Sequence, residues 1–259
     1  MAIITVNFQS QALGRKVTFS AIIPLQAQGS HEGTGEREPL KTIYLLHGYQ
    51  GDHNDWMMKT NIEQLADIYR FAVIMPAGEN SFYVNQSTGG HYATYVGEEL
   101  VRVTRELFPL SHKREDTSIV GLSMGGYGAL RNGLKNLNTF GQIAAFSSVI
   151  LTKSERIVKD NPVARIPMLE SIVGSNDIKD LGLENDLVQI VHDAQEKGTM
   201  PAIFLACGTE DALCDDNQAF HEFLLEENVE HQYIAYPGEH DWDFWKMTIE
   251  QIFPWLLNR

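Results

Sequence analysis

The stretch "SIVGLSMGGYGAL" at residues 118–130 decides the fold class. The apolar run before Ser123 is typical of a strand buried on both faces, and the residues after it are typical of a helix. Gly121 and Gly125 complete the pattern G-x-S-x-G, in which a sharp turn holds the serine in a strained conformation and a side chain at either glycine would collide with its neighbours. An ordinary glycine-rich turn is the alternative. We predict a nucleophilic Ser123 at the carboxyl end of a sheet, beside a helix N-terminus that favours negative charge.

Short, continuously apolar runs recur along the rest of the chain, and stretches with helical spacing separate most of them. One such stretch carries a single apolar face made of Tyr92, Val96, Leu100, Val103 and Leu107. Buried strands that alternate with helices form right-handed parallel crossover units. The predicted fold class is therefore α/β, a mainly parallel twisted sheet with helices on both faces. The runs are "TIYLLH" (42–47), "FAVIMPA" (71–77), "SIVGLS" (118–123), "QIAAFSS" (142–148), "AIFLACG" (202–208) and "QYIAYPG" (232–238).

Three further segments complete the predicted organisation. Residues 1–25 alternate apolar and polar side chains twice, which predicts two antiparallel strands joined through Gly14. Residues 26–39 are glycine-rich and polar, as in a surface loop. Residues 149–183 contain no clean strand, and we interpret them as an insertion after the sixth strand. The chain is then predicted to be a single domain over residues 1–259.

The composition limits the partners of the protein. A formal net charge of −14, without a cluster of basic residues, argues against nucleic acid and anionic membranes. The chain has two cysteines, too few for a disulfide framework or a zinc site. No secretory signal and no apolar run long enough to span a membrane is visible. We expect a soluble cytoplasmic protein that acts on a small molecule, and the sequence leaves a homo-oligomer open.

A serine nucleophile requires a base, and His240 is the best candidate. It follows the last apolar run, in a loop before the final helical stretch, where a fold of this class places its catalytic histidine. Gly238 and Trp242 flank it. The alternative for a histidine in a loop is an exposed residue without a role.

The base in turn needs a carboxylate that holds its tautomer and stabilises its positive charge. Asp211 follows the preceding strand and gives the order serine, acid, histidine along the chain. Glu210, Asp215 and Asp216 are local rivals. We prefer Asp211 because Asp215 and Asp216 lie where the next helix would start, and helix capping explains acidic residues there.

A serine hydrolase also needs N–H groups that stabilise the oxyanion of its tetrahedral intermediate. The Met124 N–H, directly after the nucleophile, is one candidate donor. The turn after the run at 42–47 supplies the Tyr49 N–H as the second. We interpret His47 as a structural residue that braces this turn.

Asp52, His53 and Asp55 could be metal ligands, but capping of a helix around Asn54 is the simpler interpretation. Because backbone N–H groups would hold the oxyanion, the predicted site contains no metal and no cofactor.

On the basis of four motifs, the chain resembles the α/β-hydrolase superfamily. Within this superfamily it is similar to the esterase D-like carboxylesterases of the bacterial tributyrin or acetyl esterase type. The motifs stand in the order that this family shows. The motifs are "LLHGYQGDHNDW" (45–56), "GLSMGGYGAL" (121–130), "CGTEDALCDDN" (207–217) and "PGEHDWDFW" (237–245).

The resemblance implies a serine hydrolase of short-chain acyl esters. It assigns Ser123, Asp211 and His240 to the triad and the Tyr49 and Met124 N–H groups to the oxyanion hole. S-formylglutathione hydrolases and feruloyl or cinnamoyl esterases are relatives with the same triad. The former commonly carry Ser-Gly-Leu-Thr-Cys at the oxyanion loop, whereas this chain has His-Gly-Tyr-Gln-Gly at 47–51. A binding module that has the hydrolase fold but no activity is a further alternative.

Overall fold

The strands of the chain form one mixed, mainly parallel sheet. The computed structural model describes residues 1–25, 38–86, 89–159, 168–175 and 177–258. Within them, eight strands are arranged in the order β1-β2-β4-β3-β5-β6-β7-β8. The pairs β1·β2 and β2·β4 are antiparallel and the remaining pairs are parallel. The strands are β1 (Ala2–Ser10), β2 (Arg15–Ile23), β3 (Lys41–Leu46), β4 (Phe71–Pro76), β5 (Thr117–Leu122), β6 (Gln142–Phe146), β7 (Ala202–Gly208) and β8 (His231–Tyr236).

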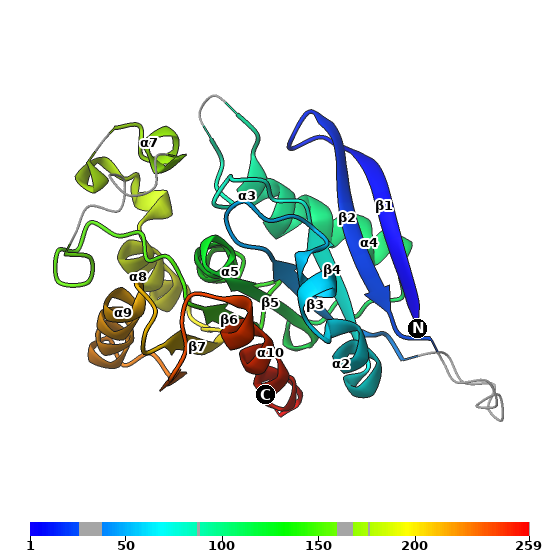
Figure 1. The fold of residues 1–259 in the computed structure, drawn as a ribbon. Helices are drawn as coiled ribbons and strands as arrows, with labels where there is room; N and C mark the ends of the chain where they lie inside the picture. Colours follow the sequence, from blue (N-terminus) through cyan, green and yellow to red (C-terminus); the bar gives the residue numbers. More distant parts are fainter. Residues whose placement is uncertain (26–37, 87–88, 160–167, 176, 259) are drawn as a thin grey trace.

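Helices cover both faces of this sheet, as the sequence predicts. Figure 1 shows α2 and α10 on one side of the sheet and α5 on the other. No helix in the described part of the chain is long and apolar enough to cross a membrane. The longer helices are α2 (Ile62–Tyr69), α4 (Leu100–Leu107), α5 (Met124–Lys135), α8 (Leu187–Lys197), α9 (Cys214–Glu226) and α10 (Trp242–Leu257). The shorter ones are α1 (Asp55–Lys59), α3 (Tyr92–Thr94), η1 (Tyr95–Glu99), η2 (Arg114–Asp116), α7 (Met168–Val173), η3 (Ile178–Asp180) and η4 (Leu183–Asn185).

Alternation of side chains along the strands creates an apolar core on each face. In β5, Ile119 belongs to the core beneath α4, α5, α8 and α9, whereas Val120 and Leu122 belong to the core beneath α1, α2 and α10. Because both faces are covered, the central strands are apolar throughout. This explains the continuous runs in the sequence.

The helical face predicted for residues 92–107 is wrong in its last part. Tyr92, Val96 and Leu100 are buried, but Leu107 is 53% exposed. A π-helical turn at Tyr95–Glu99 is the cause, because its wider winding shifts the register of the following α4. In α4 the buried side chains are consequently Leu100, Val101 and Thr104.

The segment between β6 and α8 is anchored on α5, the helix that follows Ser123. Tyr127 Oη donates to the Asn185 carbonyl at 2.8 Å, and Arg131 Nε donates to Asn185 Oδ1 at 2.9 Å. Within the described residues of 149–183, only short helices occur and no strand, in line with the expected insertion. Most of the predicted surface loop at 26–39 lies outside the described residues.

Candidate active site

Ser123 occupies a strained turn between β5 and α5. Its φ is 54° and its ψ is −119°, a conformation that non-glycine residues rarely adopt. A β-carbon on Gly121 would lie 2.2 Å from the Gly125 carbonyl oxygen, and one on Gly125 would lie 2.6 Å from the carbonyl oxygens of Leu46 and His47. The two glycines are therefore needed because strand, turn and helix approach one another through their backbones.

Alanine at Gly121 should destabilise the protein strongly. The new β-carbon would meet backbone that cannot move without displacing the turn, and we expect a loss of about 3 kcal/mol in the free energy of unfolding. Gly133→Ala is the matched control, because a β-carbon there meets the Ile143 side chain at 2.5 Å and the gain in helix propensity offsets that contact. Urea denaturation of both variants measures the difference. Equal stability of the two variants would contradict this explanation of the turn.

Two neighbouring strand ends bring the acid and the histidine together. A β-carbon on Gly208, at the end of β7, would lie 2.1 Å from the Gly238 carbonyl oxygen in the loop after β8. Glu210 fixes the same loop from its side chain, since its Oε2 accepts a hydrogen bond from the Gly238 N–H at 2.5 Å. Glu210, the alternative to Asp211 in the sequence, therefore stabilises the loop that carries His240.

Ser123, His240 and Asp211 form one hydrogen-bonded chain. His240 Nε2 is 3.0 Å from Ser123 Oγ, and His240 Nδ1 is 2.8 Å from Asp211 Oδ2. Because a carboxylate only accepts, Nδ1 carries the proton and Nε2 is free to accept one from the serine. The rivals Asp215 and Asp216 lie in the first turn of α9, where the sequence places the start of a helix.

The environment of Asp211 keeps it ionised although its side chain is fully buried. Burial alone would raise the pKa of this carboxyl group. Hydrogen bonds from His240 and from the Leu213 N–H, the latter at 2.8 Å, outweigh burial and hold the pKa of Asp211 below its ordinary value. A carboxylate with these donors can stabilise a positive charge on the imidazole throughout the neutral pH range.

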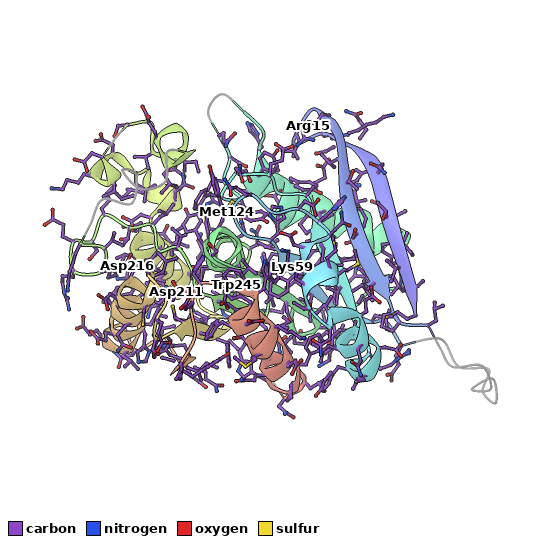
Figure 2. All side chains as sticks on the ribbon, viewed as in Figure 1. Arg15, Lys59, Met124, Asp211, Asp216 and Trp245 are labelled. Atoms are coloured by element: carbon purple, nitrogen blue, oxygen red, sulfur yellow. The ribbon has the colours of Figure 1, made fainter. Side chains whose placement is uncertain are left out.

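The imidazole of His240 is held on its other side by an aromatic ring. Trp245 contacts it edge to face, with ring centroids 5.0 Å apart, and Trp245 Nε1 donates to Ser147 Oγ at 3.1 Å. Figure 2 marks Asp211, Met124 and Trp245, which come from the loop after β7, the start of α5 and the first turns of α10. Helix α10 itself is capped by Asp241, whose side chain accepts the Phe244 N–H.

The turn after β3 carries the predicted donor Tyr49 and is rigidly braced. His47 is buried, and its Nε2 accepts a hydrogen bond from the Gly78 N–H at 2.9 Å. Its Nδ1 must then be protonated and donates to the Gly48 carbonyl at 2.7 Å. Burial, the largest effect, lowers the pKa of His47 and keeps this neutral tautomer. Met124 begins α5, where an N–H has no acceptor within the helix.

Sequence reasoning missed the loop at residues 78–83, which supports the Tyr49 turn. Tyr83 Oη donates to the His47 carbonyl at 3.0 Å, and the Gln50 N–H donates to Asn80 Oδ1 at 2.7 Å. Burial raises the pKa of Tyr83 well above its ordinary value, so the hydroxyl keeps the proton that it donates. The signal was available, because this loop follows a core strand, and ligand-binding loops lie at the carboxyl ends of parallel strands.

A cleft of about 520 Å³ opens above Ser123 and His240. Tyr49, Trp242 and Trp245 contribute aromatic surface to it, and Asp55 contributes a carboxylate. The Asn54 side chain makes no cap to α1, and instead the Asn54 N–H donates to Asp52 Oδ1 at 2.6 Å. Helix α1 thus begins after Asn54, as the sequence predicts, but the Asn54 side chain does not cap it, because its Oδ1 accepts a hydrogen bond from Ser20 Oγ.

Comparison with known proteins identifies the family. The family model for esterases matches residues 10–256. The chain belongs to this esterase family. It is 41% identical over 263 residues to an acetyl esterase of Caldicellulosiruptor saccharolyticus, an alignment that covers 99% of this esterase and 98% of the relative.

Solved structures show the same architecture. A substrate-bound, fluorophosphonate-binding serine hydrolase of Staphylococcus aureus is 32% identical and superposes with a TM-score of 0.87, covering 100% of this esterase and 99% of that chain. An S-formylglutathione hydrolase of the same organism is 31% identical, with a TM-score of 0.81 and coverage of 98% of each chain. These relatives confirm the predictions of an α/β-hydrolase fold and of a serine ester hydrolase.

Proposed function

We propose that this esterase is a serine carboxylesterase that hydrolyses short-chain acyl esters through an acyl-enzyme. The observation that carries the proposal is the hydrogen-bonded chain from Ser123 Oγ through His240 to Asp211. The acetyl esterase that aligns along nearly the whole chain supports a short acyl group. Tyr49 and Met124 are the proposed oxyanion donors.

In the acylation step, Ser123 Oγ attacks the ester carbonyl carbon while His240 Nε2 takes the serine proton. The carbonyl oxygen becomes an oxyanion, which the Tyr49 and Met124 N–H groups stabilise. When the intermediate collapses, the bond to the alcohol oxygen breaks and His240 returns the proton to the leaving alcohol. The acyl group remains on Ser123 as an ester.

Deacylation repeats these steps with water as the nucleophile. His240 takes a proton from the attacking water, whose oxygen bonds to the acyl carbon. Collapse of the second intermediate releases the carboxylic acid, and Ser123 Oγ regains its proton from His240. Asp211 stays ionised in both steps and compensates the positive charge that His240 carries transiently.

The ionisation of Asp211 affects how kcat/KM depends on pH. Hydrogen bonds from His240 and the Leu213 N–H outweigh burial and hold the pKa of Asp211 below its ordinary value, so this carboxylate stays ionised in neutral and mildly acidic solution. Between pH 8 and pH 5 we therefore expect Asp211 to stay ionised and to cause no loss of kcat/KM. A pH–rate profile for 4-nitrophenyl acetate measures this. A profile in which two protonations lower kcat/KM between pH 8 and pH 5 would contradict this role of Asp211.

A panel of substrates tests the proposed class. We expect 4-nitrophenyl acetate and butyrate to be hydrolysed with a higher kcat/KM than the octanoate, methyl ferulate or S-formylglutathione. Activity should persist in a chelator, because the mechanism uses backbone donors. A higher kcat/KM for S-formylglutathione or methyl ferulate would favour the thioesterase or feruloyl esterase alternative. The absence of turnover with every ester would favour a binding module.

A further inference from the structure

The cleft above Ser123 combines two kinds of group that attract organic cations. Tyr49, Trp242 and Trp245 supply aromatic rings, whose faces are electron-rich, and Asp55 and Asp241 supply carboxylates. None of the described residues that line this cleft is a lysine or an arginine. Both kinds of group disfavour a negatively charged ligand in the same place.

Asp55 lies next to the oxyanion turn. A β-carbon built on Gly51 would lie 2.3 Å from Asp55 Oδ2, which places the carboxylate against residues 47–51. Among the described residues, no side-chain hydrogen bond or ion pair neutralises it. A fixed negative charge here opposes the oxyanion that forms when a neutral ester reacts. A positive charge on the substrate would compensate the carboxylate and remove that penalty.

The net charge of the groups around the cleft is negative. Asp241 accepts the Phe244 N–H at 3.0 Å, a bond that leaves its charge in place. Lys59, marked in Figure 2, is the basic group beside this lining, with its Nζ 5.6 Å from the centroid of the Trp242 ring. One ammonium group next to two carboxylates does not reverse the sign. It does show that Trp242 accepts a cation over its ring.

We propose that this cleft selects esters whose alcohol carries a positive charge, and that Asp55 determines the preference. The inference rests on the proposed function, because a short acyl group has no room for a charge and the alcohol must then carry it. Asp55 acts here on specificity, without a part in proton transfer. S-formylglutathione, whose peptide portion has a net negative charge at neutral pH, is a poor match for such a cleft.

Three acetyl esters that differ in the charge of the alcohol test the proposal. They are acetylcholine, its uncharged isostere 3,3-dimethylbutyl acetate, and anionic 3-acetoxypropanoate. For the wild type we expect kcat/KM for acetylcholine to exceed that for the isostere about tenfold, and the anionic ester to be about tenfold poorer than the isostere. Both ratios should shrink as NaCl is raised, because salt screens charges at an open cleft.

The variant Asp55→Asn removes the charge with little change in shape. We expect the preference for acetylcholine over its isostere to fall at least threefold, and kcat/KM for the anionic ester to rise. Asp243→Asn is the matched control, since Asp243 is an exposed acid in the first turn of α10 that does not line the cleft, and it should leave both ratios unchanged.

The outcomes separate this inference from the proposed function. Equal kcat/KM for acetylcholine and its isostere, without an effect of NaCl, overturns the inference and leaves a working esterase. The same holds if Asp55→Asn and Asp243→Asn change the ratios equally. If the wild type hydrolyses none of the three esters and no 4-nitrophenyl ester, the proposed function itself fails.

Discussion

Ser123→Ala should lower kcat/KM for 4-nitrophenyl acetate by about 10⁴- to 10⁶-fold, the scale at which loss of a serine nucleophile removes the covalent pathway. The protein should still fold, because alanine is smaller than serine and the Ser123 side chain makes no hydrogen bond within the described residues except that to His240. The variant is measured by steady-state hydrolysis, with its melting temperature as the check on folding.

Covalent labelling provides the control for this variant. A fluorophosphonate should modify the wild type once and leave the alanine variant unlabelled, since only an activated serine attacks phosphorus. Stoichiometric labelling of the alanine variant, or retention of more than about a hundredth of the wild-type kcat/KM, would place the nucleophile elsewhere.

Asp211→Asn should have the second-largest effect, a decrease of about 10³- to 10⁴-fold in kcat. Its amide can donate to His240 Nδ1 and thereby favour the tautomer that has its proton on Nε2, where it cannot accept the serine proton. The hydrogen bond from the Leu213 N–H can persist, so we expect the loop to keep its conformation. The kcat of the purified variant at pH 8 measures the effect.

Asp215→Asn is the matched control for Asp211→Asn. Asp215 is an acidic residue of the same loop-to-helix segment, in the first turn of α9, and its replacement should change kcat by less than about threefold. The opposite ranking of the two variants would show that the wrong carboxylate has been assigned to His240.

Most of the fold could be predicted from local patterns. Strands buried on both faces leave continuous apolar runs, and the run before Ser123 is β5 in the structure. The candidate triad could also be predicted, because the carboxyl ends of parallel strands meet at one edge of the sheet. The structure brings Ser123, Asp211 and His240 within hydrogen-bonding distance there.

The features that could not be predicted depend on contacts between distant parts of the chain. The π-turn at Tyr95–Glu99 places Glu99 where it accepts hydrogen bonds from Ser10 Oγ at 2.5 Å and from the Gln11 N–H at 2.7 Å. A periodicity of 3.6 residues contains no information on such partners, and it therefore predicts the wrong face for Leu107. Likewise, the position of Asn80 and Tyr83 after a core strand indicates a loop near the site, but their hydrogen bonds to the Tyr49 turn join distant parts of the chain and leave no local pattern.

The close approach of Gly208 and Gly238 has a consequence for how this chain can change over evolutionary time. Asp211 and His240 are fixed relative to each other by main-chain contacts at the ends of adjacent strands, among them the hydrogen bond from the Thr209 N–H to the Tyr236 carbonyl at 3.0 Å. The surface of the intervening helix α9 is not part of that junction. Substitutions at its exposed positions can therefore accumulate without altering the backbone contacts that fix the distance between Asp211 and His240.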